Sequence, residues 1–218
     1  MKTIKTTTFL LVAFLVSNVL SAQNDNEAKT LVKEVLDKVE SYENFVIDFT
    51  YTLENTEQNL KQETRGDVSI KDEKYVLNLM GTTQIFDGEK IYTIVPEDDE
   101  VTISSYDEAN TEQITPSKML TFYQEGYRFK MDVLQNVNGR KIQYVELIPM
   151  DSNDNEMKKI LLGIDKQTKH IFNLIQVQPD DTRIEFRVTK FKTDEPLSAN
   201  HFEFQKSKYA DYYINELD

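Results

Sequence analysis

Short runs of alternating apolar and polar residues, each ended by turn residues, fill most of this 218-residue chain. The stretch 81–106 shows the pattern most clearly, because Asp87-Gly88 and Pro96 separate runs rich in Ile, Val, Tyr and Thr. Asp-Gly between apolar runs predicts a hairpin with a type I′ turn, in which both central residues have positive φ. Proline ends a strand because it lacks an N–H. The stretch therefore predicts a three-stranded antiparallel meander over 84–86, 90–95 and 100–105.

The same period of two continues on both sides of this meander. It predicts further strands over 45–53, 62–71, 74–80, 127–133, 141–148, 160–164, 170–177, 183–191 and 202–204. About eleven antiparallel strands, each with one apolar face, are too many for a flat open sheet. We therefore expect an α+β fold in which the sheet either curls into an unclosed half-barrel or splits into a sandwich.

Two segments have a helical rather than a strand pattern. Apolar residues from Ala28 to Tyr42 recur at helical spacing and predict a helix with one buried face. A second, short helix is predicted between Thr115-Pro116 and Gly126, because proline is tolerated in a first helical turn. This segment is unusually apolar for its length, so we expect it to act as a lid over the sheet. The lid residues are Met119, Leu120, Phe122 and Tyr123. Residues 195–200 permit one more short helix.

Alternation assigns one set of large apolar side chains to the inner face of the curved sheet. The set is Phe49, Leu53, Leu77, Leu79, Ile94, Phe129, Met131, Leu162 and Phe186. A shift of one residue would turn a whole strand outward, so this assignment is a sharp prediction. In the half-barrel alternative these side chains line a hollow that the two helices fill only in part.

The first residues have the pattern of a secretory signal peptide. Lys2 and Lys5 precede an apolar run over 9–20, and Ala22 is a small residue at a suitable cleavage position. We expect residues 1–22 to be removed and 23–218 to form a single domain. The chain has no cysteine. The exported protein is therefore expected to have neither a disulfide nor a lipid anchor of its own.

The chain is strongly acidic. Its formal net charge is −13 at pH 7, and loss of the two lysines in 1–22 makes it −15. Such a charge disfavours binding to nucleic acid and to anionic membrane surfaces. It favours a partner with a basic surface, although solubility alone explains it equally well.

Residues that carry common catalytic chemistry are scarce. Without cysteine, and with only His170 and His201, the chain has no zinc motif and no nucleophile–base motif. The acidic clusters 97–100 and 151–156 lack the spacing of a calcium loop. We therefore expect no catalytic residues, no metal and no cofactor. A hydrolase with a pair of neighbouring carboxylates stays open as an alternative.

The order of several short motifs resembles one known family over nearly the whole exported chain. These motifs are Asn44-Phe45-Val46-Ile47-Asp48-Phe49-Thr50, Gly66-Asp67-Val68-Ser69-Ile70-Lys71, Ile85-Phe86-Asp87-Gly88-Glu89-Lys90-Ile91-Tyr92, Thr115-Pro116 and Phe202-Glu203-Phe204. Their arrangement is similar to that of the periplasmic outer-membrane lipoprotein carrier proteins. The resemblance implies an unclosed antiparallel barrel with a helical lid, whose cavity holds the acyl chains of lipoproteins in transit.

The resemblance also implies a location and partners. It implies a monomeric periplasmic carrier that receives lipoproteins from an inner-membrane lipoprotein-releasing ABC transporter and delivers them to an outer-membrane acceptor. Relatives have an Arg-Pro pair after the second motif, and its arginine holds the lid, whereas this chain has Asp72-Glu73. The resemblance therefore does not transfer that lid contact to this chain. A related carrier of glycolipid or free lipid is the alternative within the same fold.

Overall fold

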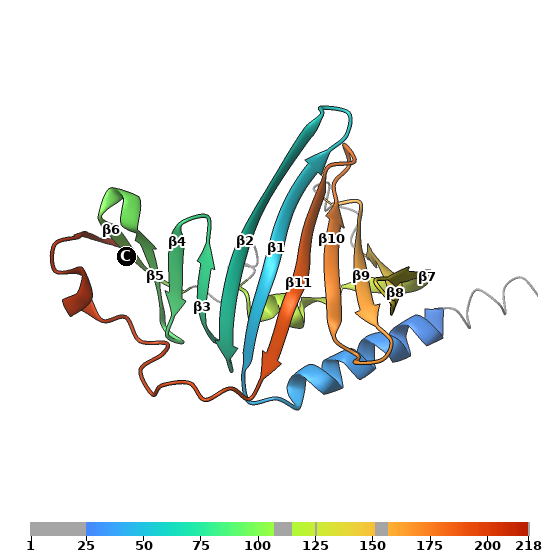
Figure 1. The fold of residues 1–218 in the computed structure, drawn as a ribbon, viewed down its shortest axis with the longest axis horizontal. Coiled ribbons are helices and arrows are strands. Elements are labelled where there is room, and N and C mark those ends of the chain that lie inside the picture. The colour runs from blue at the N-terminus through green and yellow to red at the C-terminus, as the bar shows by residue number, and fades with distance from the viewer. Residues whose placement is uncertain (1–24, 107–114, 125, 151–156, 218) are drawn as a thin grey trace, which may run out of the picture.

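The computed structural model describes residues 25–106, 115–124, 126–150 and 157–217. Within them, twelve strands form one sheet in the order β12-β6-β5-β4-β3-β2-β1-β11-β10-β9-β8-β7. The sheet is strongly curved and open, with β7 at one end and β12 at the other (Figure 1). It curls into a half-barrel and does not split into a sandwich, which confirms the predicted α+β half-barrel.

The strands follow the predicted alternating runs closely. Their bounds are β1 Phe45–Asn55, β2 Leu60–Lys71, β3 Lys74–Leu79, β4 Thr82–Phe86, β5 Lys90–Val95, β6 Glu100–Ser105, β7 Tyr127–Val137, β8 Arg140–Pro149, β9 Lys159–Asp165, β10 Ile171–Val177, β11 Arg183–Thr193 and β12 Tyr213–Leu217. Short 3-10 turns lie at η1 Pro96–Asp98, η2 Lys118–Leu120, η3 Phe122–Gln124 and η4 Lys206–Tyr209.

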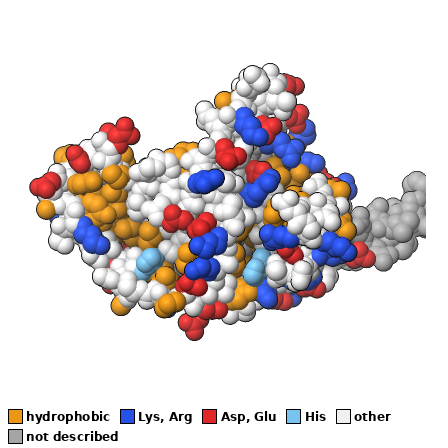
Figure 2. Space-filling view, viewed as in Figure 1, with side chains coloured by type: hydrophobic (Ala, Val, Ile, Leu, Met, Phe, Trp, Pro, Cys, Tyr) orange, Lys and Arg blue, Asp and Glu red, His pale blue; other side chains and the backbone are white. Residues whose placement is uncertain are grey.

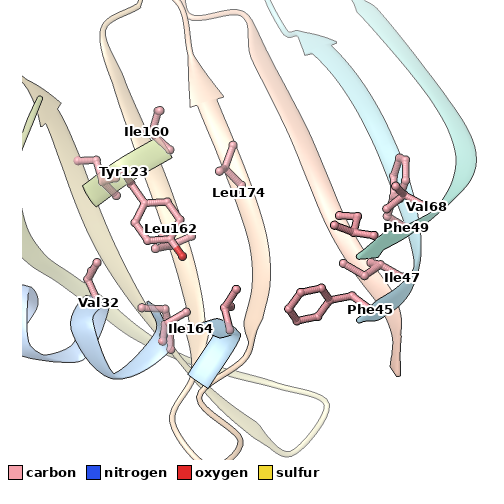
Figure 3. Close-up of a cluster of buried hydrophobic side chains, with 14 of the residues drawn as sticks. Val32, Phe45, Ile47, Phe49, Val68, Tyr123, Ile160, Leu162, Ile164 and Leu174 are labelled. Atoms are coloured by element: carbon pink, nitrogen blue, oxygen red, sulfur yellow. The ribbon is translucent and has the colours of Figure 1, made fainter. Parts of the chain in front are cut away.

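The N-terminal helix spans residues 25–40 and confirms the predicted apolar stripe. Its residues Ala28, Val32 and Val35 are fully or almost fully buried, in the same core as Leu162 and Ile164 of β9 (Figure 3). The helix therefore covers the β8–β10 end of the inner face. None of the described helices is long and apolar enough to cross a membrane.

The register of the strands lines up apolar side chains in rows across the inner face. One row runs from Phe45 through Ile70, Tyr75 and Phe86 to Ile91, and all five side chains are buried. Such cross-strand neighbours are the basic unit of sheet stabilisation. Ile70 of this row also lines the cavity described below.

Two turns that look alike in the sequence differ in the structure. Asn138 and Gly139 have φ of 52° and 84°, as a type I′ turn requires. At Asp87-Gly88, by contrast, only Gly88 has a positive φ, so the prediction of a type I′ turn there is wrong. The Asp87 carboxylate instead accepts the main-chain N–H groups of Glu89 and Lys90 at 2.9 and 2.8 Å. The aspartate thus stabilises a longer turn through its side chain.

The C-terminal segment departs from the prediction. Residues 202–204 form no strand and residues 195–200 form no helix. The Phe204 ring instead stacks on Tyr92 of β5, with the ring centroids 4.6 Å apart. The last strand is β12, which pairs with β6 in parallel, the one parallel pair in the described sheet. This segment runs beneath the sheet to its β6 end (Figure 1).

The C-terminal segment covers the outer face of the sheet around β5. We call the apolar group there the outer cluster. It comprises Ile85, Ile94, Val101 and Ile103, with Val76, Tyr92, Phe204, Tyr209, Tyr212 and Ile214 packed against them. Hydrophobic side chains gather at this end of the molecule on the face shown in Figure 2. Ile94 was expected on the inner face, and this is wrong: Ile91, three residues earlier, occupies that face of β5.

Candidate functional site

An apolar cavity of about 290 Å³ lies between the inner face of the sheet and the lid segment. Strands β1–β4, β10 and β11 supply its floor and walls, and residues after Thr115 supply its roof. The lining residues are Ile47, Phe49, Val68, Ile70, Leu77, Leu79, Gln84, Pro116, Met119, Leu120, Ile171, Leu174, Phe186 and Val188. All but one are apolar. The cavity therefore suits a ligand without polar groups of its own.

Among the described residues that line the cavity, Gln84 has the one polar side chain. Its Oε1 accepts the Tyr75 hydroxyl at 2.6 Å, and its Nε2 donates to Thr93 Oγ1 at 3.4 Å. Burial raises the pKa of Tyr75, which keeps its hydroxyl protonated and able to donate. The amide is thus satisfied by the protein itself. None of the described residues that line the cavity has a side chain that is a nucleophile or a general base.

The lid is made of two 3-10 turns and not of the single helix predicted. The Met119 N–H donates to the Thr115 carbonyl at 2.9 Å, which closes a first turn after Pro116. Thr121 then leaves helical geometry, with φ −134° and ψ −12°, and separates η2 from η3. Met119 and Leu120 face the cavity. The Phe122 side chain lies outside the described residues.

Tyr123 belongs to the lid but not to the cavity lining. Its side chain is fully buried, and it lies over Leu162 and Ile160 of β9 (Figure 3). The lid thus has two parts with different surroundings. The part around η2 roofs the cavity, and Tyr123 in η3 is packed into the core shared with the N-terminal helix.

A hydroxyl contact joins the lid to the β2–β3 turn. The Ser117 hydroxyl donates to the main-chain carbonyl of Glu73 at 3.2 Å, and the Lys118 ammonium lies 5.4 Å from the centre of the Tyr106 ring. In the family that the sequence resembles, an arginine holds the lid at the position that Asp72 occupies in this chain. Here the contact uses main-chain atoms of the same turn, so it does not depend on the side chains of Asp72 and Glu73.

Four of the nine predicted inner residues line the cavity together: Phe49, Leu77, Leu79 and Phe186. The bulky Phe49 ring lies over Gly66 of β2, where a Cβ would come within 2.7 Å of both the ring and the Asn78 carbonyl. Only glycine at position 66 allows the ring this place.

The other predicted residues lie elsewhere. Phe129 and Met131 of β7 pack against the core at the far end of the sheet, and Leu162 is fully buried beneath Tyr123. Leu53 lies four residues beyond Phe49 on β1, past the cavity lining, and is half-buried. Ile94 is in the outer cluster.

Sequence reasoning missed several lining residues. Ile47 could have been predicted, because it lies two residues before Phe49 on the same face of β1. Val68 could have been predicted as well, because it lies opposite Leu77 of β3. The same holds for Val188, because it lies two residues after Phe186 and therefore on the same face of β11.

The residue that alternation misplaces is Phe191. The β1–β11 register shifts between Asp48 and Phe49, so Phe191 lies opposite Ile47 and packs against the same core as Val188. A bulge of this kind leaves no clear mark in one sequence.

A second hollow, which we call the polar notch, adjoins the cavity. It has a volume of about 810 Å³ and is lined mainly by polar residues of β1–β4, with Phe49 and Leu79 on the cavity side. Asp67 accepts the Asn78 amide at 2.9 Å, and Asp48 pairs with Lys190 at 3.6 Å. Both carboxylates thus have structural partners. In the described residues, no group of three or more His, Asp or Glu side chains is placed to hold a metal ion.

Comparison with known proteins fits this architecture. The family model of the outer membrane lipoprotein carrier protein LolA matches residues 40–205. A search of curated proteins gives no match.

Two crystal structures share the fold at low sequence identity. An uncharacterized conserved protein of Thermus thermophilus is 10% identical, with a TM-score of 0.56 over 85% of this chain and 98% of its own. Lipoprotein LppX of Mycobacterium tuberculosis is 13% identical, with a TM-score of 0.52 over 80% of this chain and 98% of its own. At such identities the likeness shows the fold alone. The family model, however, covers well over half of the chain, and the chain therefore belongs to the LolA outer membrane lipoprotein carrier family.

Proposed function

We propose that the protein is a periplasmic carrier that shields the acyl chains of lipoproteins during transfer from the inner to the outer membrane. The observation that carries this proposal is the apolar cavity under the lid. Of its described lining residues, the one with a polar side chain, Gln84, is already hydrogen-bonded within the protein. Membership of the carrier family supports the same function.

The energetics of lipid transfer explain why a cavity without catalytic groups is sufficient. Exposing an acyl chain of about fourteen methylenes to water costs roughly 11 kcal/mol, at about 0.8 kcal/mol per methylene. Unassisted passage through an aqueous compartment is therefore negligible. A cavity lined by Leu77, Leu174, Phe186 and similar side chains offsets that cost by burial alone.

The size of the cavity supports a lid that moves when cargo enters. At about 290 Å³ the cavity is at the lower end of the range of roughly 300–1,000 Å³ for ligand pockets. Met119 and Leu120 form part of the roof, and a bound acyl chain can replace their apolar contacts because such contacts are non-directional. Loading would displace η2 and enlarge the cavity, while Tyr123 anchors the lid.

The proposal includes the location and partners expected of such a carrier. Residues 1–22 would direct export and be removed, which leaves 23–218 as a single domain. A monomeric carrier would take its cargo from the inner-membrane lipoprotein-releasing ABC transporter and pass it to an outer-membrane acceptor. The other candidates are a carrier of glycolipid or free lipid, which the same cavity would fit, and a hydrolase, for which the cavity supplies no catalytic side chain.

Mass spectrometry of the cargo tests the proposal. The protein is purified without detergent from the periplasm of cells that produce it naturally, and bound species are identified in the native complex. We expect acylated protein or peptide at one copy per carrier. Glycolipid or free fatty acid as the sole bound species would replace the lipoprotein proposal by its alternative. A carrier that holds no acylated species at all would contradict both.

A further inference from the structure

Strands β1 and β2 form an arm that extends past the neighbouring hairpin. β2 has twelve residues, but β3 pairs only with its second half, Gly66–Lys71. The first half, residues 60–65, pairs with β1 on one side and, within the described residues, with no strand on the other. Figure 1 shows this arm rising above the β3–β4 hairpin, and Figure 2 shows it projecting from the body.

The free side of residues 60–65 is an unused sheet edge. Alternate N–H and C=O groups of an edge strand point away from its partner and can pair with another extended chain. Six residues span about 20 Å at roughly 3.3 Å per residue. Lys61, Glu63 and Arg65 are exposed along this edge. Charged side chains there oppose pairing between two copies of the protein, so the edge is free in a monomer.

The polar notch lies where this edge meets the hairpin tip. Arg65 and Gly66 of β2 line it together with Met80, Gly81 and Thr82 of the hairpin. Met80 is one of the most exposed large apolar residues of the described chain, with 63% of its surface accessible. The notch is therefore open to a ligand from solvent, and its floor leads directly to the β2 edge.

The notch and the apolar cavity share a wall. Phe49 and Leu79 line both hollows, with Gly66 between them in the cross-strand row. Because the Phe49 ring lies over Gly66, this row is apolar on the cavity side and forms the boundary between the two hollows. A ligand whose apolar part fills the cavity would bring its polar end out beside this row, at the start of the free edge.

We propose that the free edge of β2, residues 60–65, binds the peptide segment that follows the acylated residue of the cargo. The segment passes through the polar notch and pairs with β2 as a further strand, while the acyl chains of the cargo lie in the cavity. Strand addition uses main-chain hydrogen bonds and therefore accepts many sequences. The exposed side chains of Lys61, Glu63 and Arg65 carry both signs of charge, and Lys61 pairs with Glu54 at 3.7 Å, so the edge favours a segment with polar side chains. This inference rests on the proposed carrier function and adds a second binding site to it.

Amide hydrogen exchange on the full exported chain tests the inference, with three ligands that carry the same acyl chain. They are palmitate, an N-palmitoylated polar hexapeptide, and that lipopeptide with every peptide nitrogen methylated. We expect all three to slow exchange in the lid residues 117–124. Only the unmethylated lipopeptide should also slow exchange in residues 60–65, by about tenfold for one or two new hydrogen bonds. Its affinity should exceed that of the methylated form by a similar factor. The amides of β7, the edge at the other end of the sheet, serve as the internal control and should not change.

Three results would overturn the inference in distinguishable ways. If the lid is protected by all three ligands but residues 60–65 exchange equally fast with each, the edge does not bind peptide and the carrier function stands. If no ligand protects the lid, the carrier function and the inference both fail. Protection of residues 60–65 without ligand, in a protein that sediments as a dimer, would show that a second copy occupies the edge and would also overturn it.

Discussion

Leu77 and Leu79 are neighbours on the inner face of β3, but their surroundings differ. Leu77 lines only the apolar cavity, beside Val68 and opposite Gln84. Leu79 lines the cavity and the polar notch. This difference predicts unequal effects of the same substitution at the two positions.

Leu77→Glu should abolish acyl binding. A carboxylate in an apolar cavity without a partner costs several kcal/mol, and about 2.7 kcal/mol already lowers affinity 100-fold. Leu79→Glu should lose less acyl-binding affinity than Leu77→Glu, because the new carboxylate at position 79 can reach the polar notch. Fluorescence titration with an acyl probe measures both.

Leu134→Glu is the matched control for these substitutions. Leu134 lies on β7, is 50% exposed and is remote from the cavity lining, so its replacement should leave acyl affinity unchanged. All three variants should keep the wild-type circular dichroism, since position 77 borders a hollow. Global unfolding of Leu77→Glu would show that this position is packed core, and the cavity would then not be the binding site.

His170 connects the N-terminal helix segment to the sheet. Its Nε2 lies 3.0 Å from the Tyr42 hydroxyl, and its ring lies against Phe191 with centroids 4.4 Å apart. Burial, and next the positive charge of Lys38, lowers the pKa of His170 in the folded protein. In the unfolded chain the pKa of a histidine is about 6.5. The unfolded state therefore binds this proton more readily.

The free energy of unfolding should consequently fall as the pH decreases from about 6.5 to the lowered pKa of His170 in the folded protein. His170→Gln keeps an acceptor for Tyr42 but cannot titrate, so its stability should depend less on pH between 7 and 5. Urea denaturation across this range measures the difference. Identical slopes for the two proteins would show that His170 does not carry the pH dependence.

At the scale of elements, the lid is the part whose stability matters most for the proposed function. Ser117 contributes its hydroxyl bond to the Glu73 carbonyl, whereas Met119 and Leu120 contribute non-directional apolar contact. Segments held by few directional bonds open well below the global free energy of unfolding. The lid should therefore open locally while the sheet stays folded.

Ser117→Ala should make this opening easier. The lost hydrogen bond is worth about 0.5–1.5 kcal/mol, so amide exchange in residues 117–124 should speed up about two- to tenfold, with global stability nearly unchanged. Thr121→Ala is the control, because the Thr121 hydroxyl contacts only the Lys118 carbonyl within the lid itself. Equal acceleration in both variants would show that the Ser117–Glu73 contact does not hold the lid.

The elements were predictable from sequence to the extent that they depend on local pattern. The stripe from Ala28 to Val39 and the alternation in β1 are local, and both appear as expected. The pairing of β12 with β6 joins Tyr213 to Glu100, which lie far apart in the sequence, and no local pattern marks it. The division of the lid at Thr121 likewise depends on how its two parts pack.

At the scale of the whole molecule, the sheet has apolar groups on both faces. The inner face holds the cavity and the helix, and the outer face holds the outer cluster beneath the C-terminal segment. This explains why Ile94 could not be placed from sequence, since Ile91 and Ile94 are both buried on opposite sides of β5. The polar notch was also invisible, because it results from β2 being twice as long as β3.

The two apolar faces also allow the central claim to be tested directly. A palmitate analogue with a photoreactive diazirine in its chain is bound to the exported protein, irradiated, and the labelled residues are mapped by mass spectrometry. We expect saturable labelling of cavity residues such as Leu77, Leu120 and Leu174, with competition by unlabelled lipopeptide. Labelling confined to the outer cluster around Tyr92 and Phe204, or labelling that does not saturate, would contradict the claim that the cavity under the lid holds the acyl chain.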